Sequence, residues 1–464
     1  MNHSNFSQFM TLSMGAALGY VLMRLHEEFD GQRASLSRVA ARLSHRSMRS
    51  VWAAMGVIVL GAAAIFMSMS RGGVISMLIA GGFTVVMLSL KKGLRGRGWV
   101  IAMMALLSFI VVLYVGFDAA YERLATLSDP QAEGGRIQIL KDVALAWTRF
   151  PVFGVGLGTH EVVYPMFDRS TITALAAHAE NEYAQAAEET GAIGLLALVA
   201  LAFFVWRSYA RNVRRLSVPA RSAVFGLGFG LLAILIHSLS DFGQHVPANA
   251  ALTGSFCGLL IAIERMGAAR GDQTGQPAEP NRLATRLAGV AIPAILLVSL
   301  VWALGGVDNC RQAEAHWDDA LAVESRLRKA DWLGSNEEYA AIIAAAEQAA
   351  ACDDGNIEYG HWLSVYRWKS ISRVMDPETG NVVLPARGRE FAERIVAEMA
   401  RTRLICPTFG ATSSVMGQLE WYVLGREEGK QRIRQGYELA PCDPVAGMIA
   451  AKLDAQEGNV DAAY

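Results

Sequence analysis

The sequence predicts an all-α fold: a polytopic membrane helix bundle of about eight spans, with an exported α-helical, repeat-like domain. Three observations predict it. Hydrophobic residues make up 53% of the 464 residues and charged residues only 18%, a balance too apolar for an ordinary soluble protein. The apolar residues are gathered into separate long segments. After the last of these, amphipathic helical stretches continue to the end of the chain.

The membrane spans are predicted from length and apolarity. About 20 apolar residues in a helix cross a bilayer core of about 30 Å, and backbone polar groups in lipid must be bonded within the segment, so the spans are helices. Eight segments are near that length: 6–25, 51–69, 73–90, 99–117, 191–206, 222–240, 247–264 and 285–306.

The distribution of Lys and Arg predicts the topology. Basic residues are concentrated in alternate loops, which the positive-inside bias places in the cytoplasm. The loop 118–190, the loop 241–249 and everything after about residue 307 then lie outside the inner membrane. Met1 also falls outside, a few residues before a helix, so we expect an N-terminal helical portion to be missing. The basic loops are 26–50, 91–98, 207–221 and 265–282.

This topology divides the chain into four regions: N-terminal spans in 1–117, an exported loop in 118–190, C-terminal spans in 191–306 and an exported helical domain in 307–464. A "Tyr…Leu-Gly…Ala-Pro" rhythm in the last region resembles a tetratricopeptide repeat. Such stacks usually bind partners or hold position; the alternative is a plain helical domain without a ligand groove. Its helices are expected at 309–330, 336–351, 356–374, 387–403, 411–425, 428–439 and 444–456.

The exported loop 118–190 is too long for a simple connection, and such loops tend to be functional. Its central part predicts an amphipathic helix that Pro151 ends. The following GVGLG (154–158) is a weak match to a nucleotide-binding loop, because no strand precedes it; a tight turn is favoured. The residues expected on one helix face are Ile137, Leu140, Val143, Ala144 and Trp147.

Several short motifs occur in a fixed order. They are NHSNFSQFM (2–10), SRGG (70–73), an R…W…P-x-x-G-x-G-x-G run (136–158), HAENEY…ETGAIG (178–194) and HSLSDFGQHVPANA (237–250). Together they resemble the O-antigen ligase and polymerase superfamily of bacterial membrane glycan transferases, over roughly residues 2–265.

The resemblance implies transfer of a glycan from a polyprenyl-diphosphate carrier to a saccharide or lipid acceptor, with inversion, outside the bacterial inner membrane. It implies no metal, no nucleotide and no other cofactor. Membrane lipids are expected partners, as are polysaccharide assembly proteins through 307–464; no nucleic acid is expected. Two alternatives remain: a protein O-oligosaccharyltransferase and a non-catalytic scaffold of a polysaccharide export system.

Such a transfer needs cations for the leaving diphosphate, and the planar fork of arginine suits phosphate oxygens. Arg71 lies at the outer end of a span, where a charge is usually functional; the alternative is an arginine reaching to the interface. Arg136 matches the loop arginine of the family; the alternative is a solvated residue at a helix start. Arg123 and Arg149 are further candidates.

The reaction also uses a base for the acceptor hydroxyl. The family pattern is a His, then Asn, nine residues, Gly, two residues and a small residue. Asn181, Gly191 and Gly194 fit it, but Glu180 stands at the His position. Glu180 is one candidate, because a carboxylate near a membrane can have a raised pKa. His178 is another, although positions two apart on a helix face differently. The third alternative is that neither acts as base.

Five further polar residues are candidates for substrate binding. Asn181 and Tyr183 are expected to orient a sugar or phosphate, or else to cap a helix and lie at the interface. His160, Asp241 and His245 lie on the exported side. The spacings 237–241 and 241–245 are helical, and a polar cluster at a helix end lining the acceptor path is favoured over a metal site.

Overall fold

The computed structural model describes residues 3–29, 45–68, 70–90, 130–170, 176–216, 220–271, 282–374 and 383–459. Within these ranges every regular element is helical, which confirms the predicted all-α class. The chain forms two compact units. Unit 1 comprises Met1–His160 and Ala176–Pro277, and unit 2 comprises Glu161–Leu175 and Ala278–Tyr464.

In the part of the chain that the structure describes, 7 helices are long and apolar enough to cross a membrane, which confirms a polytopic membrane protein. The predicted span 99–117 lies outside the described residues. The spans of unit 1 are α1 (His3–Phe29), α3 (Arg49–Met67, preceded by the 3-10 turn η1, Arg46–Met48), α4 (Arg71–Leu90), α8 (Glu182–Arg215), α9 (Ala220–His237) and α10 (Pro247–Gly271).

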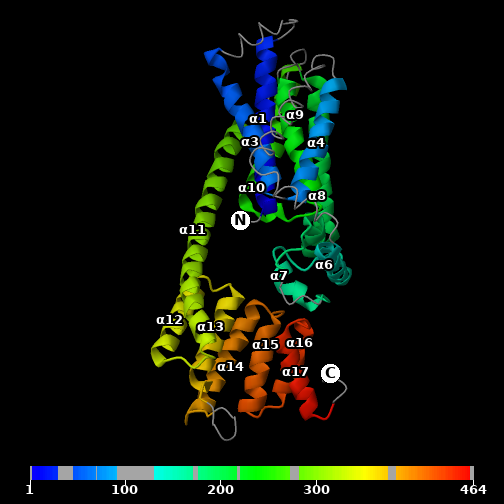
Figure 1. Cartoon of the computed structure of the whole chain (residues 1–464). Helices are drawn as coiled ribbons and strands as arrows, with labels where there is room; N and C mark the ends of the chain where they lie inside the picture. The colour runs from blue at the N-terminus through cyan, green and yellow to red at the C-terminus, as the bar shows by residue number, and fades with distance from the viewer. Residues whose placement is uncertain are drawn as a thin grey trace. The chain divides into compact units, whose positions relative to one another are not determined.

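Helices α1 and α9 form the centre of unit 1, with α3 and α4 beside them (Figure 1). Helices α1 and α9 each carry a Gly-x-x-x-Gly pair. A Cβ on Gly15 would lie 2.8 Å from the carbonyl oxygen of Gly226. Small residues let membrane helices approach closely where no hydrophobic force drives them together. The glycines therefore bring the N-terminal end of α1 beside the C-terminal end of α9.

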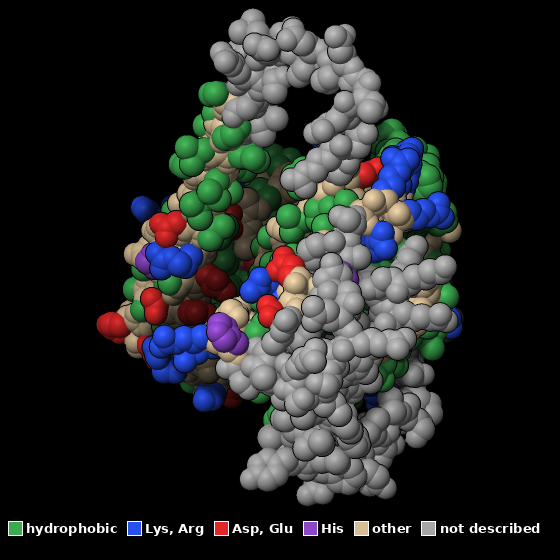
Figure 2. All heavy atoms as spheres, turned by 90° about the horizontal axis from the view of Figure 1, so that it is seen from above, with side chains coloured by type: hydrophobic (Ala, Val, Ile, Leu, Met, Phe, Trp, Pro, Cys, Tyr) green, Lys and Arg blue, Asp and Glu red, His purple; other side chains and the backbone are tan. Residues whose placement is uncertain are grey.

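Many large side chains on the spans are exposed, as expected for helices in lipid. Hydrophobic side chains cover parts of the surface that Figure 2 shows. In unit 1 they include Leu196, Val199 and Phe203 of α8, and in unit 2 Val290, Leu297 and Trp302 of α11.

Two elements of unit 1 that the predicted topology places outside the membrane are α6 (Pro130–Arg149) and the 3-10 turn η4 (Gly243–His245). Helix α6 packs against α8, so the amphipathic helix forms as predicted. Its buried face differs from the expected one. Val143 is buried, but so are Asp142 and Ala146, whereas Ile137 is 51% exposed. Polar Asp142 is tolerated inside because Gln138 donates a hydrogen bond to it.

Unit 2 is a run of helices in which each packs against the next; α11–α17 are called the helical array below (Figure 1). The predicted span 285–306 and the predicted helix 309–330 are one continuous helix, α11, so the predicted boundary at 307 falls inside it. The array consists of α11 (Arg282–Lys329), α12 (Asn336–Cys352), α13 (Ile357–Ser372), α14 (Gly388–Ile405), α15 (Gly410–Gln418, continued by the π-turn η5, Leu419–Val423), α16 (Glu428–Leu439) and α17 (Pro444–Gln456).

Candidate active site

A kink near the start of α8 shapes the part of unit 1 where α6 packs against this helix. Gly191 has φ 62° and ψ −162° within the helix, a conformation open essentially to glycine. The segment 151–158 lies against this kink. A Cβ on Gly191 would lie 2.6 Å from the Gly154 nitrogen.

The segment 151–158 and the kinked stretch 188–193 together form what we call the clasp. The N–H groups of Val155 and Gly156 donate to the carbonyls of Glu188 and Glu189 at 2.9 Å. The Gly158 N–H donates to the Glu189 carboxylate at 2.9 Å. Three N–H groups of the GVGLG run (154–158) therefore donate hydrogen bonds to α8. The run is a bracing turn, as the sequence favoured, and not an open cradle for phosphate.

Asn181 is the N-cap of α8. Its side-chain oxygen accepts hydrogen bonds from the N–H groups of Tyr183 and Ala184, and its Nδ2 donates to the Leu239 carbonyl at 2.8 Å. The Tyr183 hydroxyl donates to the Leu235 carbonyl at 2.7 Å. Both side chains thus fix the start of α8 against the end of α9; sugar or phosphate orientation by them stays a prediction.

Glu180 and Arg136 meet in front of that helix start. The Arg136 guanidinium donates to Glu180 Oε2 at 3.2 Å, and 55% of the arginine side chain and 28% of the glutamate side chain are exposed. Burial raises the pKa of the Glu180 carboxyl; Arg136 lowers it in part, and Asp241 raises it further. Glu180 itself has φ 53°, an unusual backbone conformation for a residue with a side chain.

His178 precedes Glu180 by two residues along the chain. Its ring stacks on Phe242 with 3.9 Å between centroids, and the His245 ring is 5.4 Å away. Both His178 and Glu180 precede α8, which begins at Glu182. The prediction that His178 and Glu180 lie on different faces of a helix is therefore wrong, because the chain there is not helical.

His245 is held by Glu182, whose Oε2 lies 3.1 Å from His245 Nδ1. The hydrogen bond from Glu182 raises the pKa of His245, and burial opposes this. The same carboxylate accepts the Gln244 N–H. A negative group beside an imidazole favours its charged form. The arrangement thus favours the protonated, positively charged form of His245 near His178.

Asp241 is buried, with 1% of the residue exposed. Burial raises its pKa, and hydrogen bonds from Ser4 and Gln8 act against this. Gln8 Nε2 donates to Asp241 Oδ2 at 3.0 Å, and His237 Nε2 lies 3.9 Å from the same oxygen. Helix α9 ends at His237, so the expected helical spacing between Asp241 and His245 is wrong: a bend and η4 bring His245 to Glu182.

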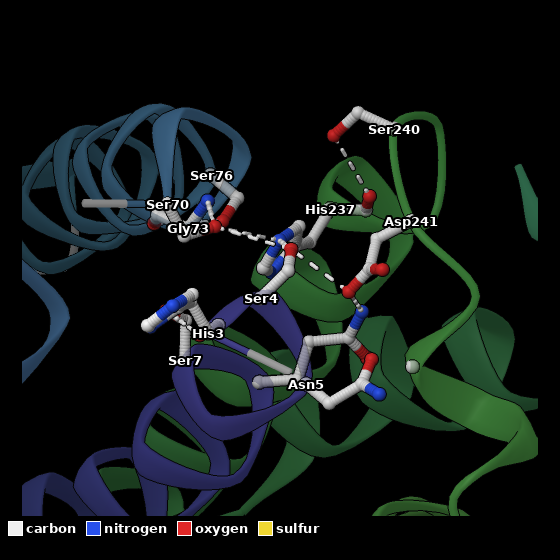
Figure 3. Close-up of polar contacts among 12 residues, drawn as sticks. His3, Ser4, Asn5, Ser7, Ser70, Gly73, Ser76, His237, Ser240 and Asp241 are labelled. Atoms are coloured by element: carbon white, nitrogen blue, oxygen red, sulfur yellow. Dashed lines mark hydrogen bonds and ion pairs between the residues drawn. The ribbon is translucent and has the colours of Figure 1, made fainter. Parts of the chain in front are cut away.

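A polar joint connects the starts of α1 and α4 with the end of α9 (Figure 3). The Ser4 hydroxyl is 2.9 Å from His237 Nε2 and 3.1 Å from the Ser70 hydroxyl. Ser70 also caps α4 by accepting the Gly73 N–H at 3.1 Å. Arg71, the first residue of α4 and partly exposed, begins next to this joint.

His160 is placed differently from the other candidates. Its Nδ1 lies 2.5 Å from Glu188 Oε2, and both side chains are buried, with at most 1% exposed. This pair fastens the end of the clasp to α8. It gives His160 a bracing role in this conformation; its predicted part in substrate binding stays a prediction.

The structure thus gathers Arg136, Glu180, His178, His245 and Asp241 around the start of α8. Sequence reasoning missed the residues that hold them there: Ser4, Gln8, Glu182, Glu188, Glu189 and Phe242. Two adjacent glutamates directly before a span would have been a signal, since charges at such a position need partners. Among the described residues no group of three or more His, Cys, Asp or Glu side chains is arranged to hold a metal ion.

Apolar side chains of the clasp are exposed beside this site. Phe153 is 76% and Leu157 82% exposed. The Val152 carbonyl accepts the N–H of Ile193, whose side chain belongs to the lipid-facing part of α8 and is 51% exposed. The apolar surface of the span therefore continues onto the segment 151–158, as at a membrane interface.

Comparison with known proteins bears on residues 56–199, which match a family model described as "O-Antigen ligase". No curated protein and no solved structure matched the chain. The matched range contains Arg71, Arg136, Glu180 and the clasp. With the membrane-spanning helices, the match indicates a multi-pass inner-membrane protein. The match supports a relation of residues 56–199 to the O-antigen ligase superfamily. It suggests a glycosyltransferase-like activity of the glycan-ligase type.

Proposed function

We propose that this chain transfers a glycan from a polyprenyl-diphosphate carrier to a saccharide or lipid acceptor at the outer face of the inner membrane. One observation carries the proposal: Arg136 and Glu180, 44 residues apart, meet at a partly exposed position at the start of α8. A guanidinium for the leaving diphosphate and a carboxylate for the acceptor hydroxyl are the two groups that this reaction uses.

The ion pair between them gives the site an order of events. Diphosphate oxygens compete with Glu180 for the Arg136 guanidinium. When Arg136 turns to the diphosphate, Glu180 loses the contact that lowers its pKa, while burial and Asp241 continue to raise it. Glu180 then becomes a stronger base. Donor binding and activation of the base are thereby coupled through one arginine.

The transfer itself is a displacement at the anomeric carbon. The acceptor hydroxyl oxygen forms the new bond from the face opposite the diphosphate, and the bond from the anomeric carbon to the phosphate oxygen breaks. The diphosphate leaves with the bonding electrons, and the hydroxyl proton passes to Glu180. Arg136 and Arg71 stabilise the charge on the diphosphate. The anomeric configuration inverts, and no metal takes part.

Other residues have supporting parts in this proposal. Asp241 and His245 line the acceptor path, with His178 beside them as the alternative base. Asn181 and Tyr183 hold the start of α8 in place. The exposed apolar side chains of Phe153 and Leu157 contact lipid and the polyprenyl chain of the donor, because they continue the lipid-facing surface of α8.

A reconstituted assay tests the proposal. The protein is placed in liposomes with a polyprenyl-diphosphate-linked oligosaccharide, and a saccharide, a glycolipid or a peptide is supplied as acceptor. We expect product on the saccharide or the glycolipid. Arg136→Ala should reduce it about 100-fold or more, as loss of a charge-stabilising donor does. Lys141→Ala, which removes an exposed cation on the same helix α6, is the matched control and should leave it unchanged.

The other outcomes separate the alternatives. Product only on the peptide would make the chain a protein O-oligosaccharyltransferase. No product on any acceptor would favour a scaffold without catalysis. Equal product from the Arg136 and Lys141 variants would remove Arg136 from the site.

A further inference from the structure

The exported loop does not stay within one unit. His160 and Ala176 belong to unit 1, whereas Glu161–Leu175 belongs to unit 2, with the helical array. The described part of this excursion, residues 161–170, is called the docked segment. It begins with α7 (His160–Val163) and the 3-10 turn η3 (Tyr164–Met166).

Hydrogen bonds and burial hold the docked segment on the array. The Thr408 hydroxyl donates to the Val162 carbonyl at 3.1 Å. The Cys442 thiol lies 3.2 Å from the Asp168 carbonyl and 3.3 Å from that of Ser170, and donates to them. Between these points η3 contacts α16, and Tyr164 is 1% exposed. The segment is therefore fastened at both ends and in the middle.

The surface that receives it is built from the starts of α13, α15 and α17. A cavity of about 400 Å³ remains between these helix starts and the docked segment. Helix starts carry partial positive charge, and the segment presents the main-chain carbonyl oxygens of Val162 and Asp168 to this surface. Glu161 and Asp168 also line the cavity. One contact opposes docking: Glu161 raises the pKa of Glu358, after the larger effect of burial.

The excursion begins and ends beside the candidate site. His160, directly before it, is paired with Glu188 in the clasp. His178, shortly after it, is stacked on Phe242. The residues His178 and Glu180 therefore follow the docked segment closely along the chain.

We propose that the helical array is a clamp for the exported loop of its own chain. Its partner is the docked segment, and Thr408, Cys442 and the surface around Tyr164 are positioning residues for the site. The binding part of this inference stands alone, whereas the effect on transfer rests on the proposed function. The array thereby has an occupant within the molecule, without an assembly protein.

The native cysteines provide the measurement. Full-length protein in nanodiscs is treated with a maleimide, and labelling of each cysteine is followed over time by mass spectrometry. Cys442 lies against the docked segment, whereas Cys310 is exposed on α11. Cys352 packs among α11–α13 and reports whether the array is folded. We expect Cys442 to label at least about tenfold more slowly than Cys310, as a contact worth one to two hydrogen bonds implies.

Two variants change docking, and one serves as a control. Thr408→Val keeps the shape but loses the bond to Val162, and should speed Cys442 labelling about fivefold. Tyr164→Ala removes the buried ring and should bring Cys442 close to the rate of Cys310. Thr402→Val, whose hydroxyl bonds within α14, should change nothing. Cys352 labelling should stay slow in all three.

Transfer by the same variants tests the effect on the site. Glycan transfer should fall in the order in which Cys442 labelling rises, with Thr402→Val unchanged. Cys442 labelling as fast as Cys310 in the unaltered protein would overturn docking. Fast Cys442 labelling in Tyr164→Ala with full transfer would overturn the positioning role. If the chain catalyses no transfer at all, the labelling still decides whether the segment is docked.

Discussion

Two polar regions of unit 1, both marked by motifs of the same resemblance, differ in how their groups are satisfied. At the start of α4, Ser4, Ser70 and His237 bond one another within a closed joint. At the start of α8, Glu180 and Arg136 are partly exposed, and the pKa of Glu180 is raised. Buried, mutually bonded groups hold helices together, whereas exposed groups with shifted pKa values are available for chemistry.

The difference assigns separate tasks to the two regions. The joint fixes α1, α4 and α9, and so places Arg71. The start of α8 supplies Glu180 and the arginine that competes for it. Asp241 connects the regions, since it lies near His237 and raises the pKa of Glu180.

The largest effect is expected at Glu180. Glu180→Gln removes the base but keeps the size of the side chain, and should lower kcat by about 100-fold to 10,000-fold. His178→Gln should cost less, because that ring is stacked on Phe242 and not paired with Arg136. Transfer rates in liposomes decide the ranking. The reverse order would move the base to His178.

Arg71 is the next test, because it lies beside the joint. Arg71→Ala should almost abolish product, lowering its amount about 100-fold or more, while the protein still inserts into the membrane. Arg71→Lys should recover part of the rate, since it restores charge but not the planar fork. If Arg71→Ala gives normal product and the same thermal midpoint as the unaltered protein, Arg71 is not needed for transfer. The region around it would then serve only to pack the helices together.

Gly191 tests the clasp. Gly191→Ala adds a Cβ against the Val152 carbonyl at positive φ, and should destabilise unit 1 by about 2–5 kcal/mol. Gly82→Ala in α4, where a Cβ would have nothing within 4 Å, is the control and should be neutral. Thermal unfolding in detergent measures both. Equal midpoints of thermal unfolding for the two variants would mean that the clasp does not stabilise unit 1.

The smallest effect is expected at Glu182. Glu182→Gln removes the negative partner of His245 and should lower the pKa of that imidazole, which NMR can follow. In the unaltered protein the raised pKa means that this pair stabilises below the ordinary histidine pKa. That stability is lost as pH rises through the raised value. The gain is about 1 kcal/mol or less. An unchanged His245 titration would exclude the pair.

The membrane class and the tail helices could be predicted because they depend on local pattern. Apolar length predicts spans, and helical spacing predicted elements such as α16 with its correct bounds. The site could be predicted only in part. Arg136 and Glu180 followed from the resemblance, but their contact depends on the kink at Gly191 and on the end of α9 at His237. Such non-local geometry is not encoded in any short stretch.

Errors arose where the chain leaves regular structure. The spacing of the residues in 178–180 and 238–245 predicts helix, yet a cap at Asn181 and a bend after His237 decide their positions. The docked segment was not foreseen at all, since its partners Thr408 and Cys442 follow it by more than 240 residues.

The pH dependence of kcat/KM decides whether Glu180 is the base. If Glu180 is the base, transfer needs its ionised form, so the rate falls as pH drops through the raised pKa of this carboxyl, above about 4.3, the usual value for glutamate. This acid limb should persist in His178→Gln and disappear in Glu180→Gln. An acid limb that survives unchanged in Glu180→Gln would contradict the account, and its loss in His178→Gln would assign the proton transfer to His178.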